Sequence, residues 1–499
     1  MAESTDHAEV AARTRRGVSW NLLGAVITNV VRLLSVVLLG RLLTAHDFGV
    51  VVAATSVLMV LHTVRDVGVG PALVQRADLT AAHRATALAT SVGLGVIITA
   101  ALVLTAPWIG ALYGIPASVP IIQALGVIFL LRGVTTVPQH LAHRAMNFRA
   151  VALVDTVSYA AGVATAIPLA LDGAGPWALV GGYLVEETLA LVIYVAMYPP
   201  SLRGGVDRTS LRDLLRFGGG QTVSQIAGVV ATQGDNMIVG NQLGEVELGL
   251  YTRAYDLIKM PALLFTTVVG NVLFPAFSRL QDQPERLAEG LRRVTFANAM
   301  VLVPASATLA VAAPEVIGLL VGPQWSSSVL PFQILSASMF FRSTYKVGAM
   351  LAAAVGWVNL VALIQVAYMV TVLIGALLAV DHGIPAVAGT TAAAIALVYA
   401  ACAALGARAA RLPLPGLLAV HGPGVLTGAV AGGAAWLIAG PARAHLGSPA
   451  LVLLAIVGAG VLAAVAVLVL GLRSGRSEFP WLGQELQRLR RRGRRGART

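Results

Sequence analysis

Long apolar stretches alternate with short polar segments from residue 17 almost to residue 472. A helix needs about 20 mainly apolar residues to cross the hydrocarbon core of a bilayer. Stretches of that length recur along the chain between Gly, Pro and clustered charges, so the pattern predicts an all-α integral membrane protein with about fourteen transmembrane helices. The predicted spans are residues 17–40, 48–70, 85–107, 119–138, 151–171, 177–197, 217–240, 251–277, 294–319, 329–351, 358–380, 384–406, 416–439 and 450–472.

A polar stretch, SLRGGVDRTSLRDLLR, separates the sixth predicted span from the seventh. It divides the spans into two six-helix lobes followed by two C-terminal helices. No segment is left that could fold as a soluble catalytic domain. The predicted parts are a cytoplasmic N-terminal segment (1–16), the N-lobe (17–200), a cytoplasmic inter-lobe linker (201–216), the C-lobe (217–406), the last two spans (407–472) and a basic cytoplasmic tail (473–499).

Composition supports the same class. Of the 499 residues, 57% are hydrophobic and 12% are charged, and the mean hydropathy is +0.80, which leaves too little polar surface for an ordinary globular exterior. The polar start of the chain and the long apolar run after it do not fit a signal peptide, so we expect the N-terminus to be retained. The single cysteine, Cys402, excludes an intrachain disulfide and a cysteine-rich metal or iron–sulfur site.

The distribution of the net charge of +12 favours a membrane over nucleic acid. With the N-terminus inside, most of the 35 Lys and Arg residues fall on the cytoplasmic side, whereas Arg41 and Arg443 fall outside. Both termini are therefore predicted in the cytoplasm of a multi-pass protein of the cell membrane. The basic tail suits the headgroups of anionic membrane lipids, and no module that reads nucleic acid accompanies it.

A short segment recurs at an offset of 200 residues. Residues 39–54 match residues 239–254, and the match aligns Gly49 with Gly249. Each copy joins two predicted spans on the extracytoplasmic side and runs in the same direction, so the lobes should be related by a pseudo-two-fold axis along the membrane normal. Parallel repeats of this kind are typical of transporters with the substrate site between the repeats.

Ionisable residues inside the predicted spans indicate a hydrated site. Each charge there costs about 2.5 kcal/mol or more unless it faces water or a partner. Arg253, Asp256 and Lys259 are three residues apart and share one helix face, either as a self-neutralising relay or as part of a site. Because the spans from residue 329 onward carry almost no charge, we expect the function to reside in the first eight spans.

Two arginines favour an anionic ligand. Arg32 and Arg132 have no opposite charge at helical spacing within their own spans. Glu186 and Glu187 of the sixth span are candidate proton or cation sites, and a pair between one of them and Arg132 is equally compatible with the sequence.

The motifs of several enzyme and pump classes are missing. The chain has no GxxxxGK[ST] phosphate loop and no HExxH zinc motif, and its predicted external loops are shorter than those expected of a polysaccharide polymerase. We therefore expect no catalytic residues, no cofactor and no metal, and a passive or ion-coupled carrier remains.

Seven stretches carry a family resemblance over roughly residues 15–360: WNLLGAVITNVVRLLSVVLLGRLLTAHDFGVVVAA, DVGVGPALVQR, HRAMNFRAVALVD, GAGPWALV, GDNMIVGNQLGEVELGLYTRAYDLIKMP, VLFPAFSRLQ and VGPQWSSSVLPFQIL. They resemble the polysaccharide transporter branch of the multidrug/oligosaccharidyl-lipid/polysaccharide exporter superfamily, in the group of the teichuronic acid and colanic acid exporters. The last four spans carry little signature.

The resemblance implies a flippase that moves polyprenyl-diphosphate-linked oligosaccharide units across the membrane for exopolysaccharide, capsule or cell-wall polysaccharide assembly. Two lobes would open alternately around a central cavity, and polysaccharide polymerases and glycosyltransferases are candidate partners. The residues expected to bind the diphosphate are Arg32, Arg132, Arg253 and Lys259. Those expected to face the sugar are Asn29, Gln225, Asp235 and Asn271, and the ion-coupling candidates are Asp235, Asp256, Glu186 and Glu187.

Other functions remain open at this point. A lipid II flippase and a multidrug extrusion carrier belong to the same superfamily, although a drug carrier usually favours acidic cavity residues. A membrane polysaccharide polymerase or glycosyltransferase is an alternative from a different class. A scaffold for assembly enzymes would leave the buried charges unexplained.

Overall fold

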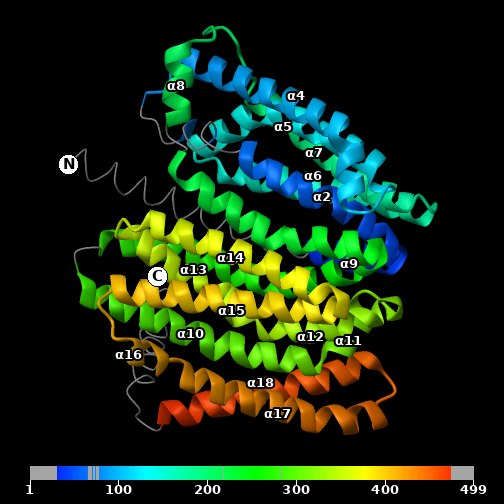
Figure 1. Ribbon diagram of the computed structural model, residues 1–499, viewed down its shortest axis with the longest axis vertical. Helices are drawn as coiled ribbons and strands as arrows, with labels where there is room; N and C mark the ends of the chain where they lie inside the picture. The colour runs from blue at the N-terminus through cyan, green and yellow to red at the C-terminus, as the bar shows by residue number, and fades with distance from the viewer. Residues whose placement is uncertain are drawn as a thin grey trace, which may run out of the picture. The chain divides into compact units, whose positions relative to one another are not determined.

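The computed structural model describes residues 31–65, 70, 73–74, 78–216, 219–280 and 283–473, and every regular element in these ranges is a helix (Figure 1). Ten of the described helices are long and apolar enough to cross a membrane. The prediction of an all-α, multi-pass membrane protein is confirmed at this level. Asn29 lies outside the described residues.

The chain divides into two compact units. Unit 1 comprises residues 1–252, 320–324 and 365–387, and unit 2 comprises 253–319, 325–364 and 388–499. The helices assigned wholly to unit 1 are α2 (Ala45–Arg65), α4 (Ala81–Leu112), α5 (Ser118–Arg144), α6 (Phe148–Leu171), α7 (Pro176–Met197), α8 (Arg208–Arg216) and η2 (Val380–His382). The helices wholly in unit 2 are α10 (Pro284–Val311), α12 (Val329–Ala337), α13 (Met339–Ala354), α16 (Leu414–Leu418), α17 (His421–His445) and α18 (Pro449–Arg473). Those that contribute to both are α9 (Gly219–Arg279), α11 (Ala313–Leu320), η1 (Pro323–Ser328), α14 (Val358–Ala379) and α15 (Ile384–Ala409).

Helix α9 runs through both of the predicted spans 217–240 and 251–277. Gly244 interrupts its helical geometry with a φ of +86°, a conformation that glycine adopts without the steric cost of a Cβ atom. A kink at one glycine thus replaces the longer connecting loop that hydropathy predicts. The predicted span 329–351 is likewise divided between α12 and α13 at Ser338.

Small residues set the packing of α17 against α10 in unit 2. A Cβ atom on Gly424, Gly428 or Gly432 would press into α10 at Ala299, Val303 and Ala307 respectively. Both sets repeat every four residues, so one face of each helix forms the contact. In lipid, where the hydrophobic effect between helices is small, such close backbone approach is a main source of packing energy.

An ion pair ties the far end of α17 to α11. The Arg443 guanidinium donates from Nε to Glu315 Oε1 at 2.6 Å and from Nη2 to Glu315 Oε2 at 3.0 Å. Nη2 also lies 3.0 Å from the Val311 carbonyl oxygen. The Glu315 side chain is 8% exposed, so the pair is partly shielded and fixes the orientation of this helix end.

The two copies of the repeated segment approach each other reciprocally within unit 1. A Cβ atom on Gly49 would overlap the carbonyl oxygen of Glu245, and one on Gly249 would overlap the carbonyl oxygen of Ala45. At the offset of 200 residues, Gly49 corresponds to Gly249 and Ala45 corresponds to Glu245, so the two contacts are equivalent with the repeat copies exchanged. This is the pattern of a self-complementary, two-fold interface, in which residue i meets j and j meets i.

We expect Gly49→Ala and Gly249→Ala each to destabilise the protein by roughly 1–3 kcal/mol, because the added methyl group meets backbone that cannot rotate away. Thermal unfolding of the detergent-purified protein would measure the loss. Gly93→Ala in α4 is the control, since a Cβ atom there meets nothing within 4 Å. Equal stability of all three variants would contradict the close approach.

Candidate functional site

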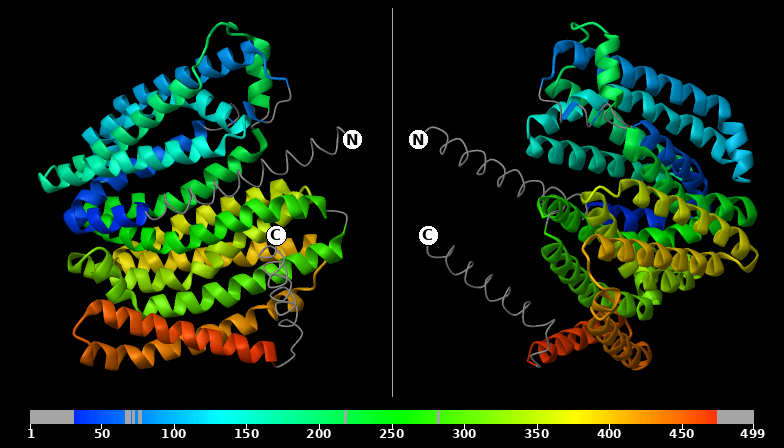
Figure 2. Two further views of the ribbon diagram at one scale, coloured as in Figure 1. Left: turned by 180° about the vertical axis from the view of Figure 1, so that it is seen from behind. Right: turned by 60° about the vertical axis from the view of Figure 1, so that its left-hand side comes forward.

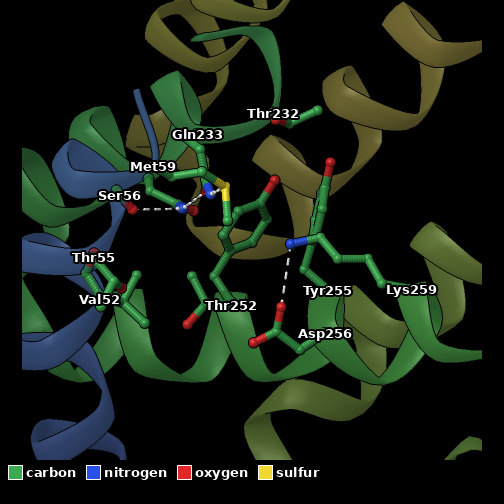
Figure 3. A network of polar contacts seen from close by, with 12 residues as sticks. Val52, Thr55, Ser56, Met59, Thr232, Gln233, Thr252, Tyr255, Asp256 and Lys259 are labelled. Carbon is green, nitrogen blue, oxygen red and sulfur yellow. Dashed lines mark hydrogen bonds and ion pairs between the residues drawn. The ribbon is translucent and has the colours of Figure 1, made fainter. Parts of the chain in front are cut away.

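Tyr255 of α9 lies at the centre of a group of cations in unit 2. Lys259 Nζ lies 4.3 Å from the centroid of its ring and Arg342 Cζ lies 4.2 Å from it. Arg342 Nη1 also donates a hydrogen bond to the Tyr255 hydroxyl at 2.5 Å. Lys259 Nζ forms an ion pair with Asp256 Oδ1 at 3.2 Å, which Figure 3 shows. Two cations therefore share one aromatic ring beside the Asp256 carboxylate.

A further cation of unit 2 stands on an aromatic ring in the same way. Arg253 is 5% exposed, and its Cζ atom lies 5.0 Å from the ring centroid of the fully buried Trp325. A cation over an aromatic face is stabilised by about 0.5–2 kcal/mol. The ring carries no net charge, so it stabilises the guanidinium without neutralising it.

Helix α13 adds to this positive charge and contains no acidic residue. Arg342 and Lys346 lie four residues apart on it and share a face. The near-absence of charge expected from residue 329 onward thus has one exception, the predicted span 329–351, which carries both cations. We missed both residues, although their spacing in the predicted span 329–351 was a signal that could have found them.

Arg132 of α5 forms an ion pair with Glu187 of α7 in unit 1. Its Nε atom donates to Glu187 Oε2 at 2.9 Å, and Nη2 binds Oε1 of the same carboxylate. The Glu187 side chain is 13% exposed and that of Arg132 is 38% exposed. The sequence leaves Arg132 either as an anion site or as the partner of Glu186 or Glu187. The structure shows it paired with Glu187, a carboxylate of the sixth predicted span.

More polar groups surround this pair from the neighbouring helices. The Tyr194 hydroxyl of α7 donates to Asp155 Oδ1 of α6 at 3.3 Å. Arg32 is exposed, and its Cζ atom lies 5.4 Å from the ring centroid of Tyr159, whose hydroxyl lies 2.6 Å from Ser35 Oγ. Unit 1 thus combines arginines with carboxylates, in contrast to the cation-rich group of unit 2.

Asp235 is fully buried in unit 1. Its Oδ2 atom accepts a hydrogen bond from the Tyr251 hydroxyl at 2.6 Å. The neighbouring Asn236 donates from Nδ2 to Ser56 Oγ of α2 at 3.1 Å and to Gln233 Oε1 at 2.8 Å. Figure 3 shows Ser56 and Met59 of α2 beside Gln233 of α9. In this conformation the Asp235 carboxylate is a bonded core group and does not face an open surface.

Of the remaining predicted site residues, Gln225 is not brought into these groups. Gln225 is exposed on α9. Asn271 falls in α9, but its side chain lies outside the described residues. The Asp256 side chain is 52% exposed and bound to Lys259, whereas Glu186 lies partly buried beside Glu187. Within the described ranges, no three His, Cys, Asp or Glu residues could together hold a metal ion.

An apolar groove of about 440 Å³ lies between α10 and α18 in unit 2. Pro304, Leu309, Val457, Val461 and Leu468 are among the residues that line it, and its surface is almost entirely apolar. A groove of this chemistry suits a hydrocarbon chain.

Comparison with known proteins gives a family. The profile of a family described as polysaccharide biosynthesis protein matches residues 38–330, more than half of the chain. The lipopolysaccharide biosynthesis protein WzxC of Escherichia coli (strain K12) is 24% identical over 341 residues, which are 66% of this chain and 68% of WzxC. The succinoglycan biosynthesis transport protein ExoT of Rhizobium meliloti (strain 1021) is 26% identical over 320 residues, 63% of this chain and 64% of ExoT. The matches thus span about two thirds of these relatives.

A solved structure shares the fold. The lipid II flippase MurJ in an inward closed conformation superimposes with a TM-score of 0.71 at 11% sequence identity, covering 91% of this chain and 99% of MurJ. With a family profile matched over more than half its length, this chain belongs to the polysaccharide biosynthesis protein family, and it shares the helical membrane fold of MurJ.

Proposed function

We propose that the protein is a flippase that moves polyprenyl-diphosphate-linked oligosaccharide units across the cytoplasmic membrane by alternating access. The units would serve exopolysaccharide, capsule or cell-wall polysaccharide assembly, alongside polymerases and glycosyltransferases. Family membership supports a role in polysaccharide biosynthesis, and the transport function named for ExoT supports export. The charge distribution favours both termini in the cytoplasm, where the basic tail 473–499 would meet anionic lipids.

The architecture we propose has about fourteen spans. Two six-helix lobes, residues 17–200 and 217–406, would be joined by a linker and followed by the two C-terminal helices α17 and α18. The reciprocal contacts of Gly49 and Gly249 support a pseudo-two-fold relation between the lobes. An axis along the membrane normal follows from the equal direction of the two repeat copies.

The observation that carries the proposal is the group of cations around Tyr255. Lys259 and Arg342 repel each other while they share its ring, and the Asp256 carboxylate, which pairs with Lys259, is itself half exposed. A diphosphate would relieve this repulsion by binding both, with the guanidinium donating two parallel hydrogen bonds and the ammonium acting as a point charge. We therefore assign the diphosphate to Arg253, Lys259 and Arg342, and the groove between α10 and α18 suits the lipid tail.

The unit 1 residues take supporting roles in this proposal. Arg32 is exposed and open to an anion, whereas Arg132 would bind the diphosphate only by exchanging Glu187 for it. Gln225, with Asn29 and Asn271, would face sugar hydroxyls. Glu186, Glu187, Asp235 and Asp256 remain the proposed ion-coupling groups, and Asp235 would reach sugar or an ion only after its bond to Tyr251 opens.

Arg342→Gln and Lys259→Gln should each reduce transport by about tenfold or more, since a hydrogen bond to a charged group contributes about 1.5–3 kcal/mol. The assay scores lipid-linked oligosaccharide with an impermeant glycosidase in a strain that lacks the protein and is rescued by each variant. Units should accumulate facing the cytoplasm. Arg342→Lys should retain more transport than Arg342→Gln, because it keeps the charge and loses only the guanidinium geometry.

Arg408→Gln is the matched control, since it removes an exposed arginine from α15 in the same unit. It should transport like the wild type at equal membrane levels. If complete units reach the outer leaflet without the protein, the flippase function is wrong. If only lipid II accumulates, the substrate is the peptidoglycan precursor.

The charge swap Arg132→Glu with Glu187→Arg separates structure from binding in unit 1. Either single substitution should lower protein stability, by less than the roughly 3–5 kcal/mol of a fully buried pair because Arg132 is partly exposed. The swap should restore stability, measured by thermal unfolding in detergent. If the swap restores stability but not transport, Arg132 leaves Glu187 to bind the substrate during transport. If the swap restores both stability and transport, the pair is purely structural.

A further inference from the structure

Helix α8 runs crosswise to the spans of unit 1. Figure 1 and Figure 2 show it lying across the end of α4, whose axis follows the membrane normal if α4 spans the bilayer. A helix that crosses the ends of the spans lies along the membrane surface. Interfacial helices adopt this orientation, with apolar side chains in the headgroup boundary and basic side chains toward anionic lipids.

The segment that leads into α8 is fixed to α4. The Asp207 backbone N–H donates to Thr86 Oγ1 of α4 at 3.0 Å. Asp207 Oδ2 in turn accepts from the Ser210 backbone N–H at 2.9 Å and from Ser210 Oγ at 3.1 Å. A Cβ atom on Gly204 would overlap the backbone of Ala81. The segment before α8 is thus held in a fixed position against the N-terminal part of α4.

The N-capping bonds also settle the charge of Asp207. The backbone N–H groups of Ser210 and then Thr209 hold the pKa of its carboxyl below the usual range. The carboxylate is therefore ionised and committed to the cap, and the arginines around it remain available to another anion.

Exposed basic and apolar side chains alternate along this segment. Leu202 is 59% exposed and Val206 is 66% exposed, although a rigid surface turn gains nothing from exposing them to water. Arg203, Arg208 and Arg212 are exposed between and after them. The positive-inside rule accounts for arginines on this side of the membrane, but it accounts neither for the apolar residues among them nor for their fixed placement.

A small cleft of about 80 Å³ opens beside the segment. It is lined by Arg84 at the start of α4, by Leu141 near the end of α5, and by Pro200, Ser201 and Gly204 of the connecting segment. The Arg84 guanidinium is the cation at the cleft, and the Ser201 hydroxyl is free to donate because its oxygen accepts from the Arg203 N–H at 3.3 Å. Both groups are donors of the kind that bind phosphate.

We propose that residues 199–212, with Arg84, form a binding site for the headgroup of an anionic phospholipid in the surrounding leaflet. Arg84 binds the phosphate at the cleft, Arg203, Arg208 and Arg212 supply the surrounding positive potential, and Leu202 and Val206 enter the boundary of the acyl chains. The interleaved apolar residues select a lipid over a free phosphate ion. This site does not involve the transported substrate, so the test of lipid binding does not depend on the proposed transport function.

The test follows hydrogen–deuterium exchange of the peptide covering 199–212 in the full-length protein in nonionic detergent, titrated with dioctanoyl-phosphatidylglycerol. The lipid should protect the peptide. The variant Arg203→Gln/Arg208→Gln/Arg212→Gln should raise the half-saturating concentration at least about tenfold, because each basic residue near an anionic surface contributes about 1 kcal/mol. Arg84→Gln should weaken protection as well.

The matched control is Arg286→Gln/Arg292→Gln/Arg293→Gln, which removes three exposed arginines near the start of α10. It should leave the half-saturating concentration unchanged, and an equal shift in both triple variants would overturn the site. Equal protection by dioctanoyl-phosphatidylcholine would also overturn it, and displacement of the lipid by inorganic phosphate would make the ligand a free anion. If the triple variant does not fold, Leu202→Ser/Val206→Ser keeps every charge, and unchanged lipid affinity in that pair contradicts the proposal.

Discussion

Lipid cannot hydrogen-bond to a peptide group, and the structure depends on that constraint throughout. Every regular element in the described ranges is a helix, whose backbone satisfies its own donors and acceptors. The same lack of water removes most of the hydrophobic effect between helices, so association relies on close packing. Glycines therefore appear where helices must come closest, at Gly49 and Gly249 between the repeat copies and along the α17 face that meets α10.

The constraint also separates two ways of keeping a charge in the membrane. In unit 1, Arg132 is bound by the carboxylate of Glu187, which gives a locally neutral pair. In unit 2, Lys259 and Arg342 rest on the ring of Tyr255, and Arg253 rests on Trp325. An aromatic face stabilises a cation through its quadrupole and leaves the net charge in place. The aromatic contacts therefore add stabilisation without cancelling charge, which suits the diphosphate site proposed for these cations, although Lys259 also pairs with the half-exposed Asp256 carboxylate.

Sequence reasoning succeeded where a single physical effect decides the outcome. Hydropathy and length set the bounds of α6, α7 and α14 to within a few residues, because an apolar helix of about 20 residues has few alternatives in this class of protein. Helical spacing, however, tells which face of its own helix a residue occupies and not which neighbour it meets. Asp235 was therefore expected to face a cavity and is instead buried on Tyr251, and the choice of Glu187 for Arg132 depends on two helices packing together.

The linker between the lobes shows how the fold constrains motion. Asp207 and Gly204 tie the segment before α8 to α4, so that segment moves with α4 and does not absorb displacement between two lobes. If the protein works by alternating access, the change in backbone conformation must come after α8. In the described ranges, the first departure from helical geometry within α9 is the kink at Gly244. Glycine adopts this conformation without the steric cost of a Cβ atom, so a fixed segment before α8 is followed along the chain by a kinked helix.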